Sequence, residues 1–231
     1  MEPPAPGSGG GGGESRGSVS SETAGAAVAG ATLLAVFGPL VGLSPAWIAV
    51  GIGGALVALT VDASQWQGLG GHLVAEALPG GRSRLRRIAC HEAGHLLIAR
   101  ENDLPVQRVL VGTRACLEAG VRSNGATEFS IPDSVRMSLE DLRRWSRVLQ
   151  AGIAAETLIY GAARGGADDR ALLGRLWGLS GHDVDTAQRE QRRARREVDQ
   201  WLRAQQPALA QLAEELLDQA SSKVAMPSSD G

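Results

Sequence analysis

The sequence has a small net charge, few cysteines and few aromatic residues. The net charge of −2 over 231 residues excludes a general attraction to nucleic acid or to anionic surfaces. Cys90 and Cys116 are too few for a disulfide framework and are typical of a reducing compartment. Aromatic residues make up 3%, whereas glycine is abundant at 31 residues and is concentrated before Arg82. The part of the chain that builds a core is therefore shorter than the length suggests.

Charged residues are absent between Glu22 and Asp62. Ala, Val, Leu, Ile and Gly dominate this gap, and residues 24–61 are about twice as long as one membrane crossing requires. Pro39 and Pro45 interrupt the segment, which favours two short helices over one long helix. The expected helices are residues 26–38 and 46–61. We interpret 24–61 as an apolar membrane segment folded as a helical hairpin, with a buried hairpin of a soluble protein as the alternative.

Polar segments flank the apolar one. Residues 1–23 are rich in Gly, Pro and Ser, predict a disordered tail and lack the basic flank of a secretory signal. Residues 62–82, which include Trp66, are expected to form a connector at the membrane interface. Four arginines stand at its end and just beyond: Arg82, Arg84, Arg86 and Arg87. The positive-inside tendency then predicts that the following domain faces the cytoplasm or an equivalent compartment such as a stroma.

Histidine is also rare, yet two of the four histidines form a His-Glu-x-x-His motif at His91 and His95. A helix from Ser83, as N-cap, to about Glu101 would place both imidazoles on one face, where they can bind a single Zn²⁺. Glu92 lies beside them and can take a proton from a zinc-activated water. A chance spacing of two helical histidines is the alternative. Catalytic zinc usually has three protein ligands, so a third is needed.

The domain that carries the motif is expected to span residues 83–220, followed by a loose tail at 221–231. Val106–Val111 and residues 127–131 have the pattern of strands, and together they predict a small antiparallel sheet with an edge that can hold an extended peptide. Further helices are expected from Ser138 to Tyr160, after Gly166, from Asp183 and from Pro207. The predicted fold class is mainly α with a small antiparallel β element.

Acidic residues further along the chain are candidates for the site. Asp168 and Asp169 begin a helix and are the best third-ligand candidates, although acidic residues at a helix start are most often simple charge stabilisation. Glu156 falls on the apolar stripe of the preceding helix. It can orient a zinc-bound histidine by accepting that histidine's other N–H, or it can pair with an arginine.

Together these motifs resemble the peptidase domain of the FtsH-type membrane-bound zinc metalloproteases. The resemblance covers about residues 84–215. It rests on the sequence Cys90-His91-Glu92-Ala93-Gly94-His95, the strand that begins Pro105-Val106, the helix start at Ser138, and Ala154-Ala155-Glu156-Thr157 with Gly161. It implies a mainly helical, zincin-like domain, Zn²⁺ as cofactor, and peptide-bond hydrolysis with Glu92 as general base.

The resemblance also implies the third ligand. In that family an aspartate at the end of Thr-Gly-Ala-x-Asn-Asp binds zinc, and the closest match here is the run from Gly165 to Asp169. This implies His91, His95 and Asp169 as metal ligands, with Asp168 as the rival. The pair His182 and Asp183 ranks lower because it lies farther from the Ala-Glu-Thr helix end than the family's aspartate does.

Two departures qualify what the resemblance implies. No Gly-x-x-x-x-Gly-Lys-Ser/Thr phosphate loop occurs in the chain, so it is similar to FtsH-like peptidases without the ATPase domain. Such a protein is expected to cleave loose or unfolded polypeptides without ATP, or to work with an FtsH-type hexamer or as a self-oligomer. Thr157 stands where the family has a second glutamate. The alternative function is a non-proteolytic FtsH-like membrane protein that serves as a binding or scaffold partner of a protease complex.

Overall fold

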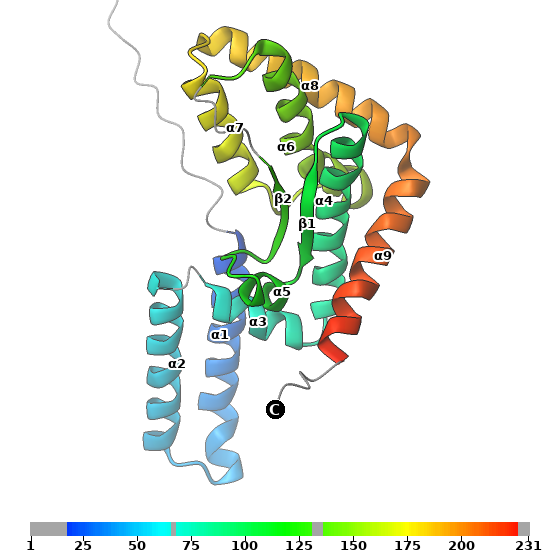
Figure 1. Cartoon of the computed structure of the whole chain (residues 1–231). Coiled ribbons are helices and arrows are strands. Elements are labelled where there is room, and N and C mark those ends of the chain that lie inside the picture. The colour runs from blue at the N-terminus through cyan, green and yellow to red at the C-terminus, as the bar shows by residue number, and fades with distance from the viewer. Residues whose placement is uncertain (1–17, 66–67, 131–135, 226–231) are drawn as a thin grey trace, which may run out of the picture. The chain divides into compact units, whose positions relative to one another are not determined.

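The computed structural model describes residues 18–65, 68–130 and 136–225 (Figure 1). The chain divides into two compact units, Met1–Ala49 and Val50–Gly231. The described elements are α1 (Ser18–Phe37), the 3-10 helix η1 (Gly38–Val41), α2 (Pro45–Gln65), α3 (Leu69–Ala77), α4 (Gly81–Glu101), β1 (Val106–Val111), α5 (Thr113–Glu118), β2 (Gly125–Phe129), α6 (Leu139–Tyr160), α7 (Ala167–Leu179), α8 (Val184–Ala204) and α9 (Gln206–Ala225). Helices thus accompany a two-stranded antiparallel sheet, which confirms the predicted fold class.

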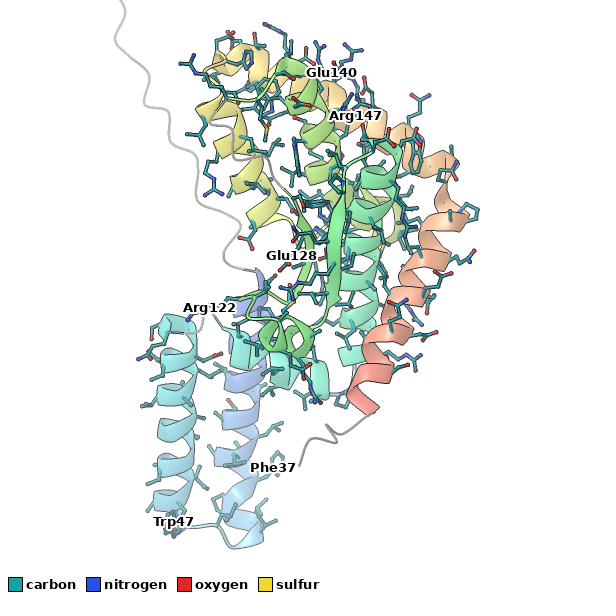
Figure 2. All side chains as sticks on the ribbon, in the orientation of Figure 1. Phe37, Trp47, Arg122, Glu128, Glu140 and Arg147 are labelled. Carbon is teal, nitrogen blue, oxygen red and sulfur yellow. The ribbon has the colours of Figure 1, made fainter. Side chains whose placement is uncertain are left out.

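The apolar segment forms helices with exposed side chains. Figure 2 shows Phe37 at the end of α1 and Trp47 at the start of α2, and both are exposed. Among the described residues, α2 is the one helix that is long and apolar enough to cross a membrane, with 21 residues and a mean hydropathy of 1.8. The apolar stretch Val28–Val41 is shorter. Helix α1 begins at Ser18, inside the segment expected to be a tail, and residues 1–17 of that segment lie outside the described residues.

The connector after α2 contains a helix that the sequence did not predict. The Asp62 carboxylate accepts hydrogen bonds from the backbone N–H groups of Gly70 and Gly71, each at 2.8 Å, and so caps α3. At the other end of α3, Gly80 adopts a φ of 97° and Gly81 packs directly against the backbone of Glu76. A side chain at position 81 would overlap that backbone, so the corner between α3 and α4 depends on glycine. Trp66 lies outside the described residues.

Helix α4 is central to the domain because it contacts α6, α9 and both strands, while α8 packs on α6 (Figure 1). Its crossing with α6 is very close at Gly94, where a Cβ would lie 2.7 Å from the Ala151 carbonyl oxygen and 2.7 Å from the Ala155 Cβ. Gly94 therefore lets the α6 backbone approach α4 more closely than any other residue would allow. The main core lies along this crossing and continues between α8 and α9.

Most element boundaries agree with the sequence, and the exceptions have local causes. Ser138 accepts a hydrogen bond from the backbone N–H of Asp141 and Gly161 has a φ of 78°, so α6 is capped as predicted. The predicted N-cap Ser83 is wrong: α4 begins at Gly81, and the Ser83 hydroxyl donates to the Gly80 carbonyl instead.

Three further elements differ from the prediction. Strand β2 is shifted toward the N-terminus by two residues relative to the predicted 127–131, and residue 131 lies outside the described residues. Helix α9 begins at Gln206, one residue before Pro207, and it continues to Ala225 inside the expected loose tail. Helix α5 was not predicted. It follows β1 directly after Gly112, whose φ of 92° lets the chain turn sharply out of the strand.

Candidate metal centre

His91, His95 and Asp169 form a group that can hold a metal ion. One potential ligand atom from each of the three residues lies within 4.8 Å of the others, and both histidines are buried. Asp169 Oδ2 is 3.0 Å from His91 Nε2 and 3.3 Å from His95 Nε2. The two histidines are one turn apart on α4, as the motif predicted, while Asp169 lies in the first turn of α7.

The hydrogen bonds of the two Nδ1 atoms determine whether each Nε2 atom presents a lone pair or a proton to the centre. His95 Nδ1 lies 2.7 Å from the Val148 carbonyl oxygen, which can only accept, so Nδ1 carries the proton and Nε2 of a neutral ring carries a lone pair. His91 Nδ1 lies 2.7 Å from Glu156 Oε1 and donates to it in the same way. Both Nε2 atoms and Asp169 Oδ2 are then acceptors that converge on one point. Such a set requires a cation or extra protons between its members.

The charges around the centre also favour a cation. Burial lowers the pKa of His91, but the hydrogen bonds with Asp169 and Glu156 more than reverse this and raise it to about 10. Burial raises the pKa of Asp169, but the neighbouring His95 and His91 hold it well below its usual range. Two imidazole nitrogens and one carboxylate oxygen are a donor set that suits zinc and similar divalent metals. The residues present therefore fit a metal ion.

Gly152 on α6 provides the room that this centre needs. A Cβ at this position would overlap Nε2 of His91 and would lie 2.6 Å from Nε2 of His95. Gly152 lies on the apolar stripe that leads to Glu156, and its role at the metal centre was not predicted from the sequence. A glycine in the interior of a long helix costs about 1 kcal/mol relative to alanine, and this cost was the one available signal.

Glu156 holds His91 and is itself held by the chain that leads to α7. Besides its contact with His91 Nδ1, it accepts a hydrogen bond from the Arg164 backbone N–H at 2.9 Å, and Arg87 lies 3.6 Å away. Burial raises the pKa of this carboxyl group, but the hydrogen bonds from His91 and Arg164 lower it below its ordinary value. Both alternatives considered for Glu156, a histidine partner and an arginine partner, are thus present together.

Glu92 is buried between α4 and β2. Its carboxylate accepts a hydrogen bond from the Thr127 hydroxyl at 2.7 Å, and a Cβ on Gly125 would lie 2.7 Å from Glu92 Oε1. Burial raises the pKa of Glu92, while the nearby His91 and His95 act in the opposite direction. Strand β2 therefore borders the same region as the two histidines.

The rival ligands lie elsewhere. Asp183 caps α8 by accepting the backbone N–H of Thr186 at 2.8 Å. The ring of His182 packs edge-on against Trp177, with 5.5 Å between the ring centroids. Asp168 is exposed and precedes Asp169 in the first turn of α7. The structure brings Asp169, and none of these three, together with the histidine pair.

Comparison with known proteins adds no family to this description. No protein-family model matches the chain, and neither a curated protein nor a solved structure matches it. What defines the site is its geometry: a buried His-His-Asp group that can hold a metal, beside a buried glutamate.

Proposed function

We propose that the protein is a membrane-anchored zinc metallopeptidase that hydrolyses peptide bonds without ATP, similar to the peptidase domain of FtsH-type enzymes. The observation that carries the proposal is the convergence of His91, His95 and Asp169 with the buried carboxylate of Glu92 next to the histidine pair. Burial of a carboxylate whose one hydrogen-bond donor is the Thr127 hydroxyl costs free energy, which supports a chemical role for Glu92 in addition to metal binding by its neighbours.

Each residue has a distinct role in this proposal. Zn²⁺, when bound by His91, His95 and Asp169, supplies a Lewis acid that polarises the scissile carbonyl and lowers the pKa of water. Glu92 acts as the general base, and its raised pKa brings it closer to the working pH of such a base. The hydroxyl of Thr127 orients this carboxylate, and Glu156 fixes the ring of His91.

The substrate class follows from the strand beside Glu92. Strand β2 pairs with β1 along one edge, and along its other edge it has no strand partner among residues 68–130 and 136–225. An extended polypeptide can add to such an edge through backbone hydrogen bonds. Because the chain contains no phosphate loop, we expect it to act on loose or unfolded polypeptides, or to receive them from a separate motor.

Helix α2 is the proposed anchor, since it is apolar along a length that suffices for one crossing. The arginines from Arg82 to Arg87 follow it on the side of the metal centre. By the positive-inside tendency they support a position of this centre on the cytoplasmic or stroma-equivalent side of the membrane.

The metal content of the purified full-length chain is the first test. We expect about one zinc per chain, lost in Asp169→Ala and retained in the matched control Asp183→Ala, which removes only a helix cap. Elemental analysis distinguishes zinc from iron, which also binds two histidines and a carboxylate. Absence of any metal after metal-replete expression would refute the proposal.

Cleavage of an unfolded polypeptide is the second test. Glu92→Gln should abolish cleavage and retain the metal, because glutamine cannot accept the proton. Undiminished cleavage in this variant would refute the role of Glu92. A chain that binds zinc but cleaves no unfolded polypeptide would instead favour the scaffold function, in which an FtsH-like domain binds partners of a protease complex.

A further inference from the structure

Helix α3 exposes an unbroken apolar face. Val74 is 60% exposed and Leu78, which caps the helix, is 57% exposed; Leu73 and Ala77 stand beside them on the same side. The opposite side of the helix carries Leu69, His72 and Glu76, which are buried or half-buried. The polar residues His72 and Glu76 thus face the domain, and apart from Leu69 the large apolar residues face outward, which is the reverse of the usual pattern on the surface of a soluble domain.

The junction with α2 fixes the position of this face. Helix α2 ends at Gln65 and α3 begins at Leu69. The backbone N–H of Gly68 donates to the Asp62 carbonyl oxygen at 3.1 Å, and the Asp62 carboxylate caps the first turn of α3. The last turn of α2 and the first turn of α3 therefore form one hydrogen-bonded corner.

The opposite side of α3 is fixed to the domain. The carboxylate of Glu76 accepts hydrogen bonds from the backbone N–H of Thr113 at 3.0 Å and from its hydroxyl at 2.7 Å. Thr113 begins α5, which contacts α3 and carries the exposed Leu117. Gly81 packs against the backbone of Glu76 and closes the corner with α4. Helix α3 is thus held at three points and is not a free linker.

We propose that the apolar face of α3 lies in the headgroup–acyl boundary of the bilayer that α2 crosses. The inference rests on the proposed anchoring by α2. The bilayer is the occupant that the structure favours, because the Asp62 corner holds this face directly after the end of the proposed spanning helix and because the exposed, basic Arg82, which can bind headgroup phosphates, follows within a few residues. The proposed peptidase domain then lies against the membrane surface.

The docked position of α3 also bears on which polypeptides reach the metal centre. Thr113 follows Gly112, whose backbone N–H donates to the Asn124 carbonyl oxygen at 3.0 Å, and the next residue, Gly125, packs against Glu92. A short chain of contacts therefore connects the docked helix with the strand that borders the metal centre. A polypeptide held at the membrane surface should therefore reach this strand more readily than the same polypeptide in solution.

The depth of α3 in a membrane can be measured on the full-length chain. Val74→Cys is labelled with a fluorophore, and the chain is reconstituted into vesicles of phosphatidylcholine and phosphatidylglycerol with spin-labelled lipids as quenchers. Cys90 and Cys116 are buried, and the unsubstituted chain controls for their labelling. We expect the label at position 74 to lie about 5–10 Å below the headgroup surface. Leu179→Cys on α7, a leucine that is 54% exposed, is the matched control and should remain in water.

The outcomes separate this inference from the proposed function. If the chain stays in the vesicles and the labels at positions 74 and 179 are equally accessible to water, the docking is refuted and the anchor stands. If the chain does not stay in the vesicles, the anchor and the docking both fail, whereas the zinc content tests the metal centre independently.

A second variant tests whether the docked helix favours polypeptides at the membrane surface. The double substitution Val74→Glu and Leu78→Glu should leave cleavage of a soluble unfolded polypeptide unchanged and should reduce several-fold the cleavage of the same polypeptide tethered to the vesicles by a lipid. An equal effect on both substrates, or none on either, would overturn the inference that α3 brings the site to the membrane surface.

Discussion

Gly152 of α6 lies so close to His91 of α4 that any side chain at position 152 would overlap the Nε2 atom of the histidine. We therefore expect Gly152→Ala to lose bound metal while the chain remains folded, because the new methyl group fills the space between the two imidazoles. Elemental analysis and circular dichroism together check this. Gly174→Ala on α7 is the matched control: the added methyl group meets open space, and the variant should keep its metal and gain up to about 1 kcal/mol in stability. Full metal content in Gly152→Ala would contradict the geometry of the site.

Glu156→Gln should weaken metal binding without abolishing it. Glutamine retains an oxygen that can accept the N–H of His91, but it lacks the charge that makes the ring a better donor to the metal. Loss of such a partner typically costs 10–100-fold in affinity, about the range expected here. Competition with a chromogenic chelator measures it. Glu128 on β2, which is labelled in Figure 2, forms an ion pair with Arg108 away from the metal centre. Glu128→Gln should therefore leave the affinity unchanged.

The stability of the metal-free protein should fall as the pH rises. The pKa of His91 is raised from 6.5 to about 10 in the folded chain, so the proton stabilises the fold fully below pH 6.5 and this contribution is lost as the pH rises toward about 10. Zinc displaces that proton and should bind more tightly over the same interval. Thermal unfolding with chelator and with excess zinc should therefore diverge as the pH increases. Parallel curves, or an unchanged divergence in His91→Ala, would contradict this assignment.

Thr127→Val should shift the pH dependence of peptide hydrolysis. The Thr127 hydroxyl stabilises the ionised form of Glu92 and so lowers a pKa that burial raises. Without this hydroxyl the pKa of Glu92 rises further, and the acidic limb of the kcat/KM profile should move to higher pH with the metal content unchanged. A drop in rate that is equal at every pH would instead indicate that Thr127 acts only through packing.

The sequence predicted the parts of the fold that depend on neighbours along the chain. Helix α6 was predicted from Ser138 to Tyr160 because the caps at Ser138 and Gly161 act within one turn of the helix ends. The start of α4 was wrong for a related reason. Ser83 has the residue type of an N-cap, but the chain reverses at Gly80 and Gly81, and only the packing of Gly81 against Glu76 shows why the helix begins there.

The metal-binding residues of the candidate site could be predicted from the sequence, but the neighbouring groups that make room for them and orient them could not. The spacing of His91 and His95 places both rings on one face of a helix. Asp168 and Asp169 were both candidates for the third ligand, and a resemblance of short motifs pointed to Asp169. Gly152 and the Val148 carbonyl could not be found in this way, because their roles depend on the crossing of α4 over α6, which brings residues more than 50 positions apart into contact. Helix α3 was missed because its apolar residues are few and face away from the domain.

The two histidines of the centre are held by different kinds of partner: a carbonyl of the α6 backbone for His95 and the side chain of Glu156 for His91. Every amino acid supplies the same carbonyl, so no substitution at position 148 removes the partner of His95. Every substitution at position 156, in contrast, changes the partner of His91. Of the two outer hydrogen-bond partners, mutational drift or deliberate engineering can therefore change only that of His91, while that of His95 is inherited with the fold.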